Sequence, residues 1–72
     1  MTKREIVLNK LQSKSVIYLY RKSCIISYTL CNDGRTVHKT RHSDNGNLTE
    51  EDIDFQSALK QLTKNFLDIM FY

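Results

Sequence analysis

Apolar residues recur at two different spacings along this 72-residue chain. Near the N-terminus and in the last third, the spacing is three or four residues, which is typical of a helix with one buried face. From residue 15 to residue 42, apolar and polar residues alternate as they do in strands. The pattern predicts one α+β domain over residues 1–72, in the order helix, three-stranded antiparallel meander, helix (α-β-β-β-α).

Both predicted helices begin at a capping sequence. We expect the first from about Lys3 to Ser13, with Thr2 as its N-cap and Glu5 closing a capping box. We expect the second from about Glu50 to Met70, because Thr49 to Asp52 repeats the same spacing. The apolar stripe of the second helix should lie in the core and comprises Phe55, Ala58, Leu59, Leu62, Phe66, Ile69 and Met70.

The three strands are expected at Ser15–Tyr20, Cys24–Cys31 and Arg35–His42, which are rich in β-branched and aromatic residues. The turn after Tyr20 contains no Gly, Asn or Pro, so the first two segments could also form one bent strand. The side chains expected to face the helices are Val16, Tyr18, Tyr20, Cys24, Ile26, Tyr28, Leu30 and Val37. Those expected to point outward are Ser27, Thr29, Cys31, Thr36, His38, Thr40 and His42.

The turn between the second and third strands carries the strongest local signal of this region. Asp33-Gly34 readily adopts the positive φ angles of a tight hairpin. With these two residues as the loop, Leu30 faces Val37, whereas a three-residue loop would place Leu30 opposite Thr36. We prefer the two-residue register because it pairs two apolar side chains.

Charged residues are sorted along the chain. Residues 1–42 hold nine of the eleven Lys and Arg against two acids, net +7, and residues 43–72 hold two against six, net −4. Within the basic part, Arg35, Lys39 and Arg41 share one face of a strand and are candidates for binding a phosphate backbone. The alternative is that they only protect a sheet edge from pairing.

Several classes of function are disfavoured by composition. No apolar run approaches the ~18 residues of a membrane span, so we expect no membrane partner, and two cysteines fit a cytoplasmic protein. A core this small would lose much of its packing to a substrate cleft of about 300 to 1,000 Å³, which argues against an enzyme. We also expect no cofactor, because both glycines are explained by turns rather than by a phosphate loop.

A zinc site is the one metal centre that the residue types suggest. It would use Cys24, Cys31, His38 and His42. Along strands, however, the two cysteines fall on opposite faces, and the two histidines lie about 13 Å apart. We therefore expect no metal, unless residues 36–42 are helical.

The C-terminal tail is more apolar than one helix face requires. Leu67, Phe71 and Tyr72 lie off the main stripe and are candidates for a contact surface with a partner or with a second copy in a homodimer. The alternative is that the N-terminal helix covers Leu67 and Phe71, which would make them part of the core.

In its element order, the chain resembles the small phage-encoded inhibitors of host defence, including anti-CRISPR proteins. The resemblance rests on a short helix, a meander turning at Cys31 to Arg35 and a closing helix capped at Thr49, in a chain without proline. It includes no diagnostic motif, so it assigns no functional residue. It implies a non-enzymatic inhibitor that occupies a surface of a larger protein or nucleoprotein complex. The alternative is a nucleic-acid-binding protein that uses Arg35 to Arg41.

Overall fold

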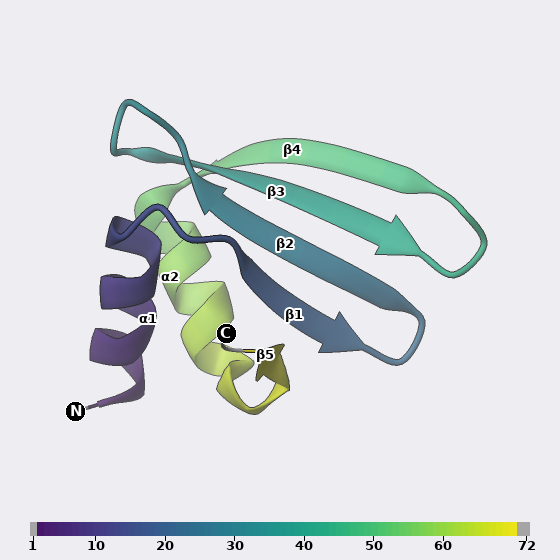
Figure 1. Ribbon diagram of the computed structural model, residues 1–72, viewed down its shortest axis with the longest axis horizontal. Helices are drawn as coiled ribbons and strands as arrows, with labels where there is room; N and C mark the ends of the chain where they lie inside the picture. Colours follow the sequence, from purple (N-terminus) through teal and green to yellow (C-terminus); the bar gives the residue numbers. More distant parts are fainter. Residues whose placement is uncertain (1, 71–72) are drawn as a thin grey trace.

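Two helices and a five-stranded antiparallel sheet make up the structure, a computed structural model that describes residues 2–70 (Figure 1). The elements are α1 (Lys3–Gln12), β1 (Ile17–Arg21), β2 (Cys24–Leu30), β3 (Thr36–Ser43), β4 (Leu48–Asp54), α2 (Phe55–Lys64), the 3-10 turn η1 (Phe66–Asp68) and β5 (Ile69–Met70). The strands lie in the order β4-β3-β2-β1-β5. The α+β class is confirmed, but the sheet has two more strands than the expected meander.

Both helices pack against the same face of the sheet, and the core lies between them and the strands (Figure 1). The capping box that starts α1 is formed as expected, since Glu5 N–H donates to Thr2 Oγ1 at 3.2 Å. The buried core comprises Val7, Leu11, Ile17, Leu19, Tyr28, Leu30, Val37, Ala58, Leu59 and Leu62. The opposite face of the sheet has no helix over it.

The expected start of the second helix is wrong. Residues 48–54 form β4, and α2 begins only at Phe55, with the Asp54 side chain accepting a hydrogen bond from Ser57 N–H at 3.2 Å. Thr49 to Asp52 has the local spacing of a helix cap, but β4 instead pairs along β3, where its acids meet His38 and Lys39. Cross-strand contacts have overridden the local capping signal.

The expected end of the second helix is also wrong. Helix α2 stops at Lys64, where the Asn65 side chain donates to Gln61 O at 2.8 Å. The chain then turns through η1, so that β5 pairs with the edge of β1. Leu62 is buried as expected and Phe66 is partly buried, but Met70 is exposed on β5 rather than in the core.

Strand β1 faces the core with its odd-numbered residues rather than with the even-numbered residues that we expected. Ile17 and Leu19 are buried, whereas Val16 and Tyr20 are exposed and Tyr18 is half-buried, so the expected orientation of this strand is wrong. A tight turn joins β1 to β2 with Arg21 opposite Cys24, and the two segments are separate strands rather than one bent strand. Residues 16–20 are almost all apolar, so alternation alone could not decide which side faces inward.

The β2–β3 hairpin has the expected register, with Leu30 opposite Val37. Its turn is wider than expected. Gly34 has a φ of +71°, but Asp33 does not adopt positive φ. Instead, the Asp33 carboxylate accepts hydrogen bonds from the N–H groups of Arg35 and Thr36, both at 2.9 Å. These hydrogen bonds lower the pKa of Asp33, because they stabilise its charged form.

Candidate interaction surfaces

The face of the sheet that the helices leave uncovered carries a row of three apolar side chains and one histidine. The pairing of the strands places Tyr20, Ile25, His42 and Leu48 next to one another across β1, β2, β3 and β4. Tyr20, Ile25 and Leu48 are exposed, with 54% of Leu48 accessible. We call these four residues the apolar row.

A second row lies beside the first on the same face. Tyr18 is opposite Ser27 on β2 and Met70 on β5, and Met70 is exposed. Solvent-facing sides of antiparallel sheets are usually polar. Tyrosine, isoleucine, leucine and methionine on an open face are instead the residue types that protein interfaces favour.

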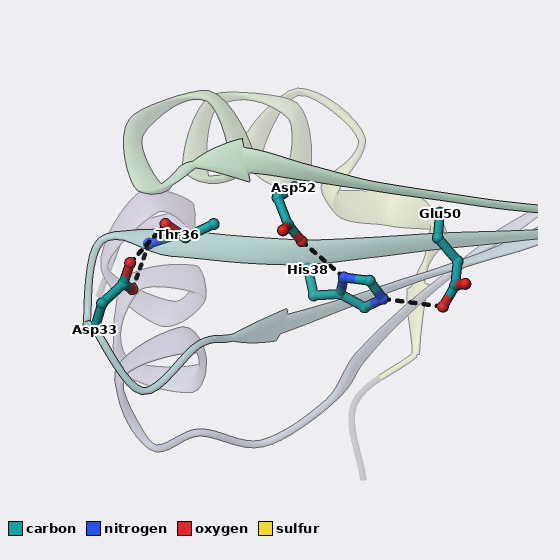
Figure 2. Close-up of polar contacts among 5 residues, drawn as sticks. All are labelled: Asp33, Thr36, His38, Glu50 and Asp52. Atoms are coloured by element: carbon teal, nitrogen blue, oxygen red, sulfur yellow. Dashed lines mark hydrogen bonds and ion pairs between the residues drawn. The ribbon is translucent and has the colours of Figure 1, made fainter.

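The far end of the open face is polar and is built around His38. Its Nδ1 lies 2.8 Å from Asp52 Oδ1, and its Nε2 lies 3.1 Å from Glu50 Oε1 (Figure 2). These contacts raise the pKa of His38, mainly through the hydrogen bond to Asp52 and then through that to Glu50. The imidazole therefore links β3 to β4 most strongly when both of its nitrogens carry a proton.

Strand β4 forms an exposed edge of the sheet. Its hydrogen bonds with β3 show which of its backbone groups point outward. Ser43 N–H donates to Asn47 O and Phe55 N–H donates to Arg35 O, so the hydrogen-bonded pairs between β3 and β4 fall on the odd-numbered residues. The N–H and C=O groups of Glu50 and Asp52 therefore point away from β3. The acidic side chains of β4 limit pairing of this edge with a second copy, because like charges would meet.

The three basic candidates of the third strand lie in different surroundings. Arg35 lies in the loop before β3. Lys39 is partly buried, with its Nζ 3.2 Å from Gln61 Oε1, 3.6 Å from Glu51 Oε1 and 5.8 Å from the centre of the Tyr28 ring. Arg41 is exposed and lines a concavity with residues of the β1–β2 turn.

Two concavities lie on the helix side of the sheet, where the strands extend past α2. The larger has a volume of about 590 Å³ and is lined by Tyr20, Arg21, Lys22, Ser23, Cys24, Ile26, Arg41 and Asp68. The smaller, of about 280 Å³, is lined by Leu19, Arg21, Ile26, Tyr28, Lys39, Gln61, Lys64 and Asn65. The two share Arg21 and Ile26.

Of the three contact candidates in the C-terminal tail, the structure describes only Leu67. Leu67 lies in η1 and is 89% exposed, so no helix covers it. Phe71 and Tyr72 lie outside the described residues. Leu67 is therefore exposed, and it lies on η1, apart from the apolar row.

The zinc candidates are not brought together. Cys24 is buried on the helix side of β2, and Cys31 follows β2 with a partly exposed side chain. Within residues 2–70, no group of three or more His, Cys, Asp and Glu side chains could hold a metal ion. The carboxylates of Asp52 and Glu50 contact opposite nitrogens of His38, which keeps the three groups from sharing one central ion.

Sequence reasoning missed Tyr20, Ile25, Leu48 and Met70 as surface residues. The available signal was Asn45-Gly46, a strong hairpin dipeptide, followed by a segment with the length of a strand. Recognising that hairpin would have placed Leu48 on the sheet beside His42.

Comparisons of the chain with protein-family models, curated proteins and solved structures find no match. Neither helix within residues 2–70 has the length and apolar character that crossing a membrane requires.

Proposed function

We propose that this protein is a non-enzymatic binding module that docks on a larger protein through the open face of its sheet. The observation that supports the proposal most strongly is the apolar row, which runs across four adjacent strands without a helix over it. A hydrophobic centre with a polar rim is the usual anatomy of a protein interface.

The open face has both parts of that anatomy. Ile25 and Leu48 supply exposed aliphatic surface at one end, and Tyr20 adds an aromatic side chain beside them. His38, with its two carboxylates, supplies charge and hydrogen-bonding groups at the other end. A partner must match both ends, which gives the face a preferred orientation for docking.

Docking is proposed to inhibit the partner by occupying its surface, in the cytoplasm, as the resemblance to phage-encoded inhibitors implies. The size of the domain is compatible with this mode. A standard interface buries about 800 Å² on each partner, and the described residues expose 4962 Å² in total. One face of the molecule is therefore large enough for stable binding.

The proposal is tested by capture from a lysate of the organism that encodes the protein, after nuclease treatment. We expect the wild-type chain to retain one protein in stoichiometric amount. The double variant Ile25→Ser with Leu48→Ser should lose that protein, because it removes the aliphatic surface from the apolar end of the face. Leu67→Ser is the matched control, since it makes a similar change at an exposed leucine on η1.

Three outcomes would contradict the proposal. Loss of capture on nuclease treatment would show that a nucleic acid carries the interaction. Loss with Leu67→Ser, but not with the double variant, would move the interface to the tail. Stable self-association of the purified chain that the double variant abolishes would make a homodimer the occupant of the face.

A further inference from the structure

The two concavities on the helix side of the sheet adjoin each other, and together we call them the groove. They meet at Arg21 and Ile26, which line both. The groove exists because the strands and the β1–β2 turn extend beyond the end of α2, leaving this part of the sheet without a helix above it (Figure 1). It lies on the side of the sheet opposite to the apolar row.

The strand pairing explains how basic residues come to line this groove. Arg21 is opposite Cys24 on β2, and Arg41 is opposite Ile26 on the same strand. All four side chains lie on the helix side, because they share the facing of the buried Leu19 and Tyr28. The two arginines therefore flank β2 and lie about 12 Å apart, across two strand spacings and a two-residue offset along β2.

The positive charge of the groove is largely uncompensated. Its lining within the described residues includes five cations, Arg21, Lys22, Lys39, Arg41 and Lys64, against one carboxylate, Asp68. Glu51 neutralises Lys39, and Arg21 donates to the neutral amide of Asn65 at 2.7 Å. In the part of the chain that the structure describes, Lys22, Arg41 and Lys64 have no acidic partner.

We propose that this groove binds a single strand of nucleic acid through its phosphates. The cations come from β1, the β1–β2 turn, β3 and α2, and this spread fits a chain of phosphates better than one isolated anion. Arginine and lysine are the side chains that bind phosphate oxygens. The two arginines flank β2, so one strand can lie across it with a sugar or base against Ile26.

The binding should not depend on base sequence. The groove offers charged groups to the phosphates and the apolar Ile26 and small Cys24 to a base, whereas the amides of Gln61 and Asn65 are hydrogen-bonded within the protein. Neither side chain can read a pattern of donors and acceptors on a base edge. This activity is distinct from docking through the open face, because the other strand residues of the groove face the helix side and only Tyr20 belongs to both surfaces.

The test measures binding of a fluorescein-labelled oligothymidylate of about twelve nucleotides by anisotropy over a series of salt concentrations. The variant is Lys22→Gln with Arg41→Gln. The matched control is Arg4→Gln with Lys60→Gln, because these two residues line another concavity along α2, which shares only Lys64 with the groove. Both double variants lower the formal net charge from +3 to +1, so only the position of the lost charge differs.

We expect the groove variant to bind about tenfold more weakly at low salt, with the log–log salt slope reduced in magnitude by about 1.4 for two lost phosphate contacts. The control should stay within about threefold of wild type. Lys64→Gln, at the other end of the groove, should give a smaller loss in the same direction. Because these side chains are exposed, the thermal midpoints should match wild type.

Binding and competition measurements with other polyanions identify the ligand. Oligouridylate should bind like oligothymidylate, and a duplex of the same length should bind more weakly. Equal losses in the groove and control variants would overturn the proposal, because net charge alone would then explain binding. Equal competition by polyglutamate at matched charge would also overturn it and assign the groove to an acidic protein segment.

Discussion

His38 has an acidic partner at each of its ring nitrogens, and both partners come from β4 (Figure 2). A neutral imidazole carries one N–H and can donate to only one of them, whereas the imidazolium donates to both. Protonated His38 therefore stabilises the pairing of β4 with β3. His42, on the same strand, faces Leu48 instead and belongs to the apolar row.

This pairing predicts that stability falls as the pH rises. The folded pKa of His38 lies above its ordinary value of 6.5. Its contribution is therefore fully present below 6.5 and is lost as the pH rises through the folded pKa. Urea midpoints measured from about pH 6 to pH 8 should decrease for wild type.

Over the same pH range, the urea midpoint of His38→Gln should change little, whereas the midpoint of His42→Gln should decrease as it does for wild type. Asp33 and Asp54 do not contribute in this range. Their pKa values are lowered from 3.8, so their contributions are lost only in acid. A wild-type slope that persists in His38→Gln would show that another group is responsible.

At the scale of elements, residues 48–54 have the local spacing of a helix start, whereas their cross-strand contacts favour a strand. The register of β2 and β3 followed from the sequence, because the Asp33-Gly34 turn and the Leu30–Val37 pair indicate the same alignment. Strand β4 could not be predicted from the sequence, because Thr49 to Asp52 has the spacing of a helix cap. Its preference for β3 comes from opposite charges that are distant in sequence, such as Lys39 with Glu51.

Proline substitution distinguishes inward from outward N–H groups on β4. Thr49 N–H points toward β3 and Glu50 N–H points to the open edge, as the ladder requires. Thr49→Pro should therefore lower the free energy of unfolding by about 1 to 3 kcal/mol, because it leaves an acceptor on β3 without its donor. Glu50→Pro should cost clearly less, because proline is tolerated where the N–H faces solvent.

Urea denaturation of the two proline variants gives the comparison, with Thr49→Val and Glu50→Gln as side-chain controls. These controls separate the effect of the lost N–H from the effect of the lost side chain. If Glu50→Pro proves the more damaging substitution after that correction, the β3–β4 register is shifted by one residue.

At the scale of the whole molecule, the sheet separates two surfaces of different character. The apolar row lies on the open face, and the basic groove lies on the side of the helices. The sequence indicated clustered basic residues, and Arg41 does line the groove. It could not indicate the groove itself, because the groove depends on α2 starting at Phe55 and ending at Lys64.

The extent of that helix also explains why the tail was only partly anticipated. A helix continuing to Met70 would have carried its apolar stripe along the core. The turn at η1 instead places Met70 beside Tyr18 on the open face and leaves Leu67 exposed. Pairing of β5 with β1 connects residues about 50 positions apart, so spacing within residues 66–70 could not reveal it.

The most direct test of docking through the open face is methyl cross-saturation, measured on the labelled chain in complex with its captured protein. Saturation of the partner should attenuate the methyl signals of Ile25, Leu48 and Met70, which lie on the open face. The signals of Val7 and Leu62, which are fully buried, and of Leu67 on η1 should keep their intensity. Attenuation at Leu67, with Ile25 and Leu48 unaffected, would contradict the account.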